Sequence, residues 1–367
     1  MRAAPPLFPD ISRGKPPGAS KGPGRSGKSG GGRPSAVALE RAGALLLVGW
    51  PGEGAYGAVS LLEEFKPAGF IYFRRNWPGS SEDLAGIIRR VNARAEKLLK
   101  RPLLWAIDQE GGTVQRLDDP PYALPPAAEM ADIFFKDGPE RVSSLTLQAG
   151  RALKELGFNF NLAPVLDVRA GDSYIASRSF SSDAETAALA AAAYAKGFRE
   201  AGLLLCGKHF PGLGSSVTDP HRDLPLVLSG VQELWARDGL PFRRLISLGL
   251  PAVMTTHALY RSLDPLLPAT FSSRILALLK KDYAFKGLVL TDDLEMEGLK
   301  PLAEPENSAV DAVVAGHDLA LAGKDPDLIR RSRGALAEAV ESGRLSSARL
   351  REAGSLLKKT LKLISRF

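Results

Sequence analysis

The stretch Gly287-Leu288-Val289-Leu290-Thr291-Asp292-Asp293 decides the fold, because it joins a short apolar run to a pair of carboxylates. An apolar run of this length with β-branched members is typical of a buried strand. Similar runs recur along the chain at fairly regular intervals. We therefore expect strands at residues 44–48, 69–73, 103–107, 158–162, 203–207, 252–255, 287–291 and 318–321.

Longer amphipathic stretches separate the expected strands, and they predict helices at residues 82–99, 140–156, 184–201, 231–248, 273–281, 328–341 and 346–364. Alternation of strands and helices is typical of a parallel sheet covered by helices. Eight strand-helix units favour an α/β fold of the TIM type, a (β/α)8 barrel formed as one domain by residues 36–367. A doubly wound open sheet is the alternative, but no glycine-rich phosphate-binding turn follows the first expected strand.

Residues 1–35 differ in composition from the rest of the chain. They are rich in Gly, Pro, Ser, Lys and Arg and carry a net charge of +6, which leaves +1 of the total +7 for the remaining residues. Such a segment cannot bury enough apolar surface to offset its ordering entropy, so we expect a disordered basic tail. The nearly neutral body does not indicate a nucleic-acid partner.

Two features of the chain bear on its location. No stretch reaches the roughly 18 consecutive apolar residues of a membrane-spanning helix, and no apolar segment of a secretory signal follows the N-terminal cations. The single cysteine, Cys206, excludes an internal disulfide. We expect a cytoplasmic monomer without a membrane span, a metal or a cofactor.

Polar and charged residues follow the expected strands at the end where a barrel places its active-site loops. They are Asp108, Glu110 and Arg116 after the third strand, Asp167 and Arg178 after the fourth, Lys208, His209, Asp219 and His221 after the fifth, His257 after the sixth, and Asp292 and Asp293 after the seventh. Each residue alone has a structural explanation, such as a turn or a helix cap. Together they predict a site at the mouth of the barrel.

The same segments resemble the single-domain bacterial β-N-acetylhexosaminidases of glycoside hydrolase family 3. The resemblance rests on motifs at residues 106–116, 161–168, 178–180, 208–212, 219–221 and 291–298, in the family order. It implies a TIM-type barrel and a retaining exo-glycosidase that removes terminal β-linked N-acetylglucosamine. Within the family, the substrates are commonly peptidoglycan fragments such as muropeptides.

The resemblance also implies a role for each matching residue. Asp292 matches the catalytic nucleophile, and His221 with Asp219 matches an acid/base pair that replaces the usual carboxylic acid. A histidine pKa of about 6.5 suits proton transfer near neutral pH. The residues that match sugar-binding positions are Asp108, Arg116, Arg178, Lys208 and His209.

Two further residues are candidates for a supporting role. Successive side chains of an extended segment point to opposite sides, so we expect only one of Asp292 and Asp293 to face the sugar. Asp293 is then expected to cap the following helix or to support the site from behind. For His257, lining the site and packing beneath it are equally compatible with the sequence.

Two residues depart from the family pattern. Leu213 stands where the family usually has a second histidine, and Pro220 stands between Asp219 and His221 where it usually has serine. Proline restricts its own backbone and that of the preceding residue, so we expect a stiffer loop there.

The sequence leaves four alternatives to N-acetylglucosaminidase activity open. A family relative could act on β-glucosides, or could use phosphate in place of water as the acceptor. Lys208 on a barrel strand could serve a Schiff-base lyase. A non-catalytic sugar-binding barrel is the last alternative, although the joint presence of Asp292, Asp219 and His221 argues against it.

Overall fold

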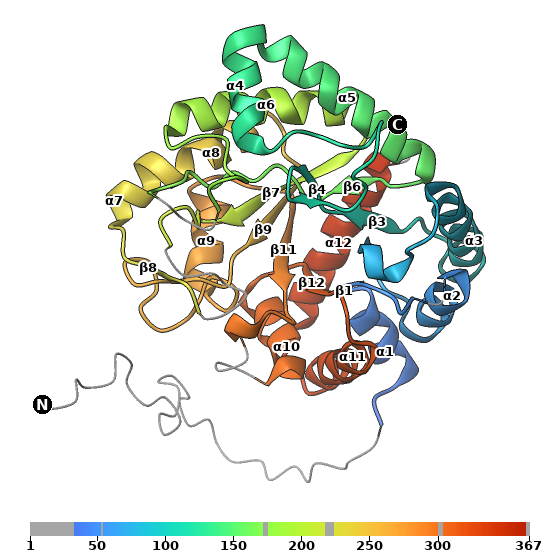
Figure 1. Cartoon of the computed structure of the whole chain (residues 1–367). Coiled ribbons are helices and arrows are strands. Elements are labelled where there is room, and N and C mark those ends of the chain that lie inside the picture. The colour runs from blue at the N-terminus through green and yellow to red at the C-terminus, as the bar shows by residue number, and fades with distance from the viewer. Residues whose placement is uncertain (1–32, 53, 172–174, 217–223, 300–303, 365–367) are drawn as a thin grey trace, which may run out of the picture. The chain divides into compact units, whose positions relative to one another are not determined.

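Eight parallel strands close into a barrel in a computed structural model of the chain (Figure 1). Their order around the barrel is β1-β12-β11-β9-β7-β6-β3-β2. They are β1 (Leu46–Val48), β2 (Gly69–Tyr72), β3 (Leu104–Ile107), β6 (Phe160–Asn161), β7 (Leu204–Phe210), β9 (Ala252–Thr255), β11 (Leu288–Asp293) and β12 (Leu319–Ala322). All eight coincide with expected strands, so the predicted (β/α)8 barrel is confirmed.

The structure describes residues 33–52, 54–171, 175–216, 224–299 and 304–364. Residues Pro34–Phe367 form one compact unit, separate from the unit Met1–Arg33. The expected disorder of residues 1–35 lies almost entirely outside the described residues and stays a prediction. In the described part of the chain, no helix combines the length and the apolar character needed to cross a bilayer.

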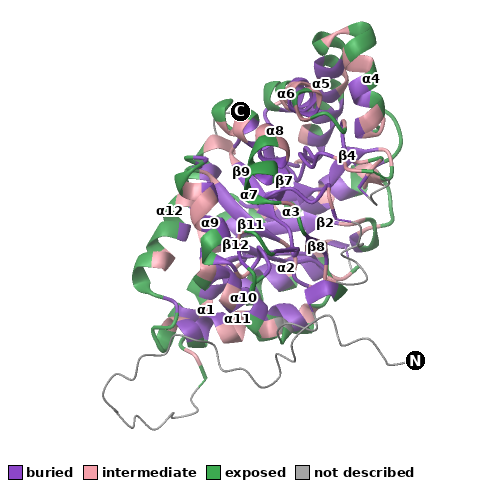
Figure 2. Ribbon diagram, turned by 90° about the vertical axis from the view of Figure 1, so that its left-hand side faces the viewer, coloured by how far each residue is buried: buried purple, intermediate pink, exposed green. Residues whose placement is uncertain are grey.

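Helices surround the barrel and turn their exposed faces outward (Figure 2). They are α1 (Ala36–Gly43), α2 (Gly54–Phe65), α3 (Ser81–Leu99), α4 (Ala127–Asp137), α5 (Pro139–Leu156), α6 (Ala184–Glu200), α7 (Val231–Glu233), α8 (Gly239–Ser247), α9 (Ser273–Lys281), α10 (Pro305–Ala315), α11 (Pro326–Glu341) and α12 (Ser347–Ile364). Side chains of Ser80, Asp183 and Ser272 accept backbone N–H bonds at the starts of α3, α6 and α9. Such caps satisfy N–H groups that the first turn leaves unpaired.

Several helices differ from those expected from the sequence. Helices α1, α2, α4 and α10 were not expected, because short, glycine-rich or β-branched segments carry a weak helical pattern. The helix expected at 231–248 is instead divided by a π-helical turn, Leu234–Asp238. Pro241 lies in the first turn of α8, where its missing N–H prevents the continuous i to i−4 pattern.

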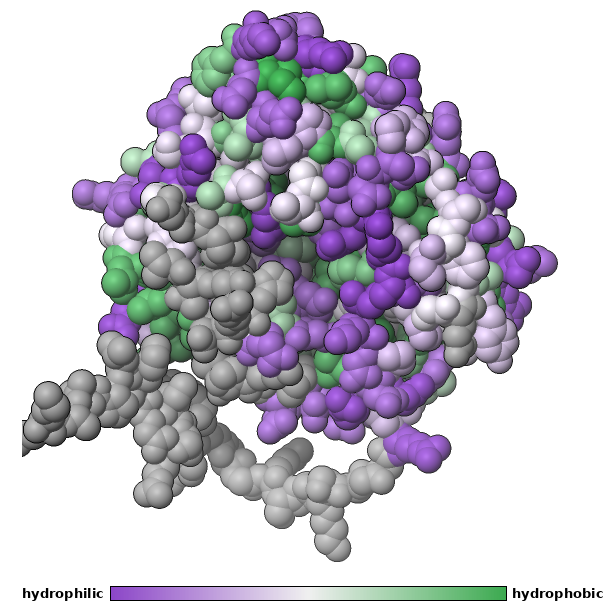
Figure 3. All heavy atoms as spheres, in the orientation of Figure 1, coloured by the Kyte–Doolittle hydropathy of each residue, from purple (hydrophilic) through white to green (hydrophobic). Residues whose placement is uncertain are grey.

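The apolar core has two layers because strand side chains alternate between the inside and the outside of the barrel. Ile71 and Leu290 belong to the inner cluster, whereas Phe70 and Val289 pack outward against the helices. Leu357 and Leu361 of α12 join the inner cluster, and Figure 1 shows α12 crossing behind the strands. At the opposite face, hydrophilic side chains surround a central hollow (Figure 3).

Two small two-stranded sheets are separate from the barrel sheet. Strands β4 (Gln109–Gly111) and β5 (Val114–Gln115) pair antiparallel directly after β3, and β8 (Leu226–Val227) pairs parallel with β10 (Leu259–Tyr260). Glu110, Val114 and Arg116 of the first sheet and its end line the cavity described below.

Candidate active site

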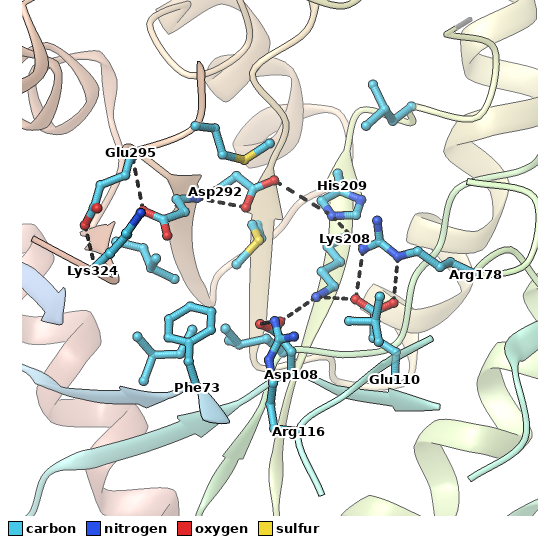
Figure 4. Close-up of a pocket in the computed structure, with 18 of the residues that line it drawn as sticks. Phe73, Asp108, Glu110, Arg116, Arg178, Lys208, His209, Asp292, Glu295 and Lys324 are labelled. Atoms are coloured by element: carbon cyan, nitrogen blue, oxygen red, sulfur yellow. Dashed lines mark hydrogen bonds and ion pairs between the residues drawn. The ribbon is translucent and has the colours of Figure 1, made fainter. Parts of the chain in front are cut away.

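A cavity of about 400 Å³ opens at the C-terminal ends of the barrel strands (Figure 4). Its wall contains six of the eight residues expected to be catalytic or sugar-binding, which are Asp108, Arg116, Arg178, Lys208, His209 and Asp292. The other two, Asp219 and His221, lie outside the described residues, as does Pro220. The barrel brings these side chains together, because the C-terminal ends of its parallel strands all lie at one face.

Asp108 lies between two cations on the cavity wall. Its Oδ2 is 2.6 Å from Arg116 Nη2 and its Oδ1 is 2.8 Å from Lys208 Nζ. Burial works to raise the pKa of Asp108, but the charges of Lys208 and Arg116 prevail and hold it well below its ordinary value. Asp108 is therefore a carboxylate, able to accept hydrogen bonds from sugar hydroxyl groups.

Glu110 completes this network, although the sequence analysis did not assign it a sugar-site role. Its Oε1 is 2.7 Å from Lys208 Nζ, and its two oxygens accept bonds of 2.8 and 2.9 Å from Nε and Nη2 of Arg178. Burial acts to raise the pKa of Glu110, yet Arg178 and Lys208 lower it to about 2. The signal that could have found it is its position two residues after Asp108, on the same side of an extended segment.

The electrostatics of Lys208 follow from the same contacts. Burial alone would lower the pKa of this amine, but Asp108 and Glu110 outweigh burial and raise it. Lys208 is therefore a buried ammonium held between two carboxylates. An ammonium without a free electron pair does not suit a Schiff-base nucleophile, so the geometry disfavours the lyase alternative.

Gln109 and Asn161 hold the β4–β5 segment that carries Arg116. Asn161 accepts from the backbone N–H of Gln109 at 3.0 Å and donates to its carbonyl at 2.9 Å. The Gln109 side chain donates to the carbonyls of Leu117 and Tyr122 and accepts from the backbone N–H of Arg116. The side chains of this buried pair thus hold the backbone of the segment from Gln109 to Tyr122, which carries Arg116.

Asp292 lies at the end of β11 and points into the cavity, with its side chain 21% exposed. Its Oδ1 accepts a 2.8 Å bond from the backbone N–H of Asp293. Its Oδ2 lies 3.9 Å from His209 Nε2. One carboxylate oxygen is therefore fixed by the backbone while the other faces the cavity.

Asp293 does not follow the simple strand alternation. Both Asp292 and Asp293 line the cavity, because a register shift between β11 and β12 interrupts the pleat from Leu290 to Asp293. Asp293 Oδ1 accepts from the backbone N–H groups of Glu295 and Gly323 at 3.1 and 3.4 Å. Burial, together with the charges of Glu295 and Asp292, raises the pKa of Asp293 to about 7.

His257 packs beneath the cavity and is not among its described lining residues. Its Nε2 donates to the backbone carbonyl of Asp293 at 2.9 Å, and its Nδ1 lies 2.6 Å from Thr270 Oγ1. These contacts support the position beneath the site, and the role of His257 stays a prediction. His257 fixes the peptide group that follows Asp293.

Several cavity residues were not expected from the sequence. Phe73, Arg75, Glu295 and Lys324 line the side of the cavity next to Asp293, and Leu213 lines it near His209. Among the residues that the structure describes, no group of three His, Cys, Asp or Glu side chains could hold a metal ion.

Comparisons with known proteins give likenesses over most of the chain. Residues 44–358 match the model of the glycosyl hydrolase family 3 N terminal domain. A β-hexosaminidase of Alkalilimnicola ehrlichii is 36% identical over 276 residues, which cover 74% of this chain and 77% of that protein. One of Neisseria meningitidis is 35% identical over 271 residues, covering 72% of this chain and 73% of that protein.

Solved structures show the same likeness. A family 3 β-N-acetylglucosaminidase from a Paenibacillus species superimposes with a TM-score of 0.85 at 33% identity, covering 89% of this chain and 62% of that one. An enzyme of Neisseria gonorrhoeae, solved with N-trifluoroacetyl-D-glucosamine, gives a TM-score of 0.71 at 27% identity, covering 87% of this chain and 98% of that one.

Proposed function

Because the chain belongs to glycosyl hydrolase family 3 and is a glycoside hydrolase, we propose that it removes terminal β-linked N-acetylglucosamine with retention of configuration. The observation that carries the proposal is the position of Asp292. It lies at a barrel strand end, faces the cavity and has no lysine or arginine bound to it among the described residues, and its Oδ2 lies 3.9 Å from His209 Nε2, whereas burial and neighbouring charges raise the pKa of the adjacent Asp293 to about 7.

Asp292 is the proposed nucleophile. Its Oδ1 is held by a backbone N–H, so Oδ2 is presented to the anomeric carbon of a sugar in the cavity. In a retaining reaction, this oxygen forms a bond to that carbon as the glycosidic oxygen leaves, and water then displaces the carboxylate. A carboxylate paired to a cation would be a weaker nucleophile, and this explains why Asp108 and Glu110 do not suit the role.

The paired charges opposite Asp292 form the proposed sugar subsite. Asp108, Lys208, Arg116, Arg178 and His209 offer both donors and acceptors around one ring-sized space. Charge-assisted bonds to hydroxyl groups are short and directional, and a sugar that leaves one of these buried groups unpaired loses binding energy. This arrangement supports recognition of a terminal sugar ring.

His221, held by Asp219, is the proposed proton donor and later the base. Glu110 does not suit the role, because a carboxyl with a pKa near 2 is ionised at neutral pH and its oxygens are occupied by Arg178 and Lys208. Among the described residues, Asp293 is the carboxyl group that could serve as the proton donor in place of His221, because its pKa of about 7 leaves it partly protonated at neutral pH.

The proposed natural substrates are peptidoglycan fragments that end in N-acetylglucosamine. This rests on the family resemblance and on the names of the relatives, which are β-hexosaminidases and β-N-acetylglucosaminidases. A cytoplasmic location and a monomeric state are parts of the same proposal.

The test compares p-nitrophenyl N-acetyl-β-glucosaminide with p-nitrophenyl β-glucoside, each with and without phosphate. We expect turnover of the first substrate without phosphate, and NMR of the released sugar should show the β-anomer first. Preference for the glucoside, or a requirement for phosphate, would contradict the proposal and favour the corresponding alternative.

Asp292→Ala should lower kcat by at least 1000-fold and leave the melting temperature nearly unchanged, because it removes the covalent step from an open cavity wall. Asp132→Ala on the exposed face of α4 is the control. Retention of more than about a tenth of wild-type kcat, which is a barrier change under about 1.4 kcal/mol, would contradict the assignment.

His221→Ala should lose most activity toward sugar leaving groups, which need protonation, and less toward p-nitrophenol, which does not. Hydrolysis of the covalent intermediate should then be slow, so a burst of phenol and acceleration by azide are expected. Asp219→Ala should show a milder form of this pattern. Equal losses with both leaving groups and no azide effect would direct the search to Asp293.

A further inference from the structure

Asp167 is a buried carboxylate beside the cavity that the proposed reaction does not use directly. Its side chain is fully buried, and no lysine or arginine nitrogen lies within ion-pair distance of it in the described chain. A buried carboxylate is costly unless hydrogen bonds or an opposite charge compensate it. The contacts that compensate Asp167 therefore indicate what it does.

Those contacts converge on one turn at the end of β7. Asp167 Oδ2 lies 2.7 Å from His209 Nδ1, and both carboxylate oxygens are 3.3 Å from the backbone N of His209. Oδ1 also accepts a 2.7 Å bond from the backbone N–H of Leu213. Asp167 thus holds the ring of His209 and both ends of the segment from His209 to Leu213.

The backbone of Asp167 links this turn to a second site loop. Its carbonyl accepts a 2.6 Å bond from Ser179 Oγ, directly after Arg178 in the chain. Arg178 Nη2 in turn lies 3.5 Å from His209 Nε2. A single buried residue therefore connects the loops that carry Arg178 and His209.

The chemistry of the carboxylate determines how the histidine ring is presented. Both oxygens of Asp167 accept backbone N–H bonds, and Arg178 Nη2, which can only donate, faces His209 Nε2, so the contacts assign the proton between Asp167 and His209 to Nδ1. Nε2 is then the ring atom that faces the cavity, 3.9 Å from Asp292 Oδ2. Figure 4 shows the ring of His209 between Arg178 and Asp292.

We propose that Asp167 is a positioning residue that sets the tautomer and the orientation of His209, so that Nε2 is presented to the bound sugar beside Asp292. The proposal rests on the proposed function, because it takes His209 to contact the substrate. Asp167 itself does not line the cavity, so it acts through His209 and Leu213.

Asp167→Asn tests the proposal directly. An asparagine amide can donate to Nδ1 and thereby favour the opposite tautomer, with the proton on Nε2. We expect kcat/KM to fall at least about tenfold, as for other residues that orient a functional histidine. Nitrogen-15 NMR of ring-labelled histidine should show that Nδ1 of His209 loses its proton, with the signal assigned from His209→Gln.

Asp264→Asn is the matched control. Asp264 is also buried, and it accepts from the backbone N–H groups of Leu266 and Leu267 and from Ser272 Oγ, with no histidine contact. Its variant should lose thermal stability while the His209 signals and kcat/KM stay within twofold of wild type. Equal losses of kcat/KM in the two Asn variants would overturn the proposal.

A double-mutant cycle separates positioning from a general structural role. If Asp167 acts through His209, Asp167→Asn should cause no more than about a twofold further loss in a His209→Gln background. Additive losses would overturn the proposal. Asp167→Ala, which removes the acceptor of His209 Nδ1 and supplies no donor, replaces the Asn variant if the latter does not fold.

The NMR measurement does not depend on turnover. An inactive wild-type protein whose His209 still changes tautomer in Asp167→Asn would contradict the proposed function but support the coupling. An active wild-type protein whose His209 keeps its Nδ1 proton in the variant would contradict the positioning role alone.

Discussion

Glu110 shows how ion pairing decides the role of a carboxylate at the scale of a single residue. It lies in the same cavity as Asp292, and its side chain is only 4% exposed. Burial alone would favour the neutral acid, as a proton donor requires. Contacts with Arg178 and Lys208 reverse that preference, so Glu110 is a permanent anion that fixes the cations of the sugar subsite.

Glu110→Gln should destabilise the fold in a pH-dependent manner. The folded pKa of about 2 lies below the ordinary value of 4.5, so the ionised group contributes stability above pH 4.5 and loses it as the pH falls toward 2. The free energy of unfolding of the variant should be about 3 kcal/mol lower than that of the wild type at pH 7. Urea unfolding at pH 7, 4 and 2.5 measures the difference in unfolding free energy between the wild type and the variant. This difference should decrease as the pH falls.

The exposed Glu338→Gln on α11 is the control for that series and should show little change at any of the three pH values. A constant loss for Glu110→Gln across the pH range would contradict the ionic explanation. Such a result would instead point to the changed shape of the side chain.

At the scale of elements, the site depends on close contacts between neighbouring helices on the outside of the barrel. Helices α5 and α6 pack tightly, and Gly197 of α6 lies against the backbone of α5. Tyr194, one turn before Gly197, donates to the carbonyls of Gln109 and Glu110 at 2.8 and 3.1 Å. The packing of α6 is therefore coupled to the segment that carries Glu110.

Gly197→Ala should destabilise the protein and weaken the site. An added Cβ would lie 2.1 Å from the carbonyl oxygen of Ser143 and 2.1 Å from Thr146 Oγ1, so the helices must separate. Overpacking of this kind costs about 1–3 kcal/mol. Thermal unfolding and kcat/KM measure both effects, since movement of α6 also shifts Tyr194.

Gly334→Ala in α11 is the matched control. An added Cβ there meets no atom within 4 Å, and alanine favours a helix over glycine by about 1 kcal/mol. This variant should be slightly more stable than wild type. Similar losses in the two glycine variants would show that the contact between α5 and α6 is not the cause.

At the scale of the whole molecule, the compact barrel unit includes the last two residues of the segment expected to be disordered. The compact unit begins at Pro34. Ser35 caps α1 by accepting from the Ala38 N–H, and its own N–H donates to Glu341 on α11 at 2.7 Å. Ser35 is therefore part of the packed barrel unit.

Deletion of residues 1–33 should leave kcat/KM on a small neutral substrate and the melting temperature unchanged. A deletion that also removes Pro34 and Ser35 should lose the α1 cap, at a cost of about 1 kcal/mol. Melting curves and initial rates of the two truncated proteins distinguish these outcomes. A tenfold fall in kcat/KM for the shorter deletion would show that the tail belongs to the site.

The sequence by itself determined the eight strands and the positions of most site residues. Strand formation depends on short apolar runs, and a residue such as Asp292 or Lys208 can be placed at a strand end from its neighbours alone. Because all eight strands are parallel, their ends meet at one face, so the convergence of these residues followed from the fold class.

Only the tertiary structure decided which of these residues pair with one another. Glu110 contacts Arg178 and Lys208, and Asp167 contacts His209, across long separations in sequence. The shifted register of β11 and β12 also turned Asp293 into the cavity beside Asp292. No local pattern records such contacts, because barrel closure and strand register bring the partners together.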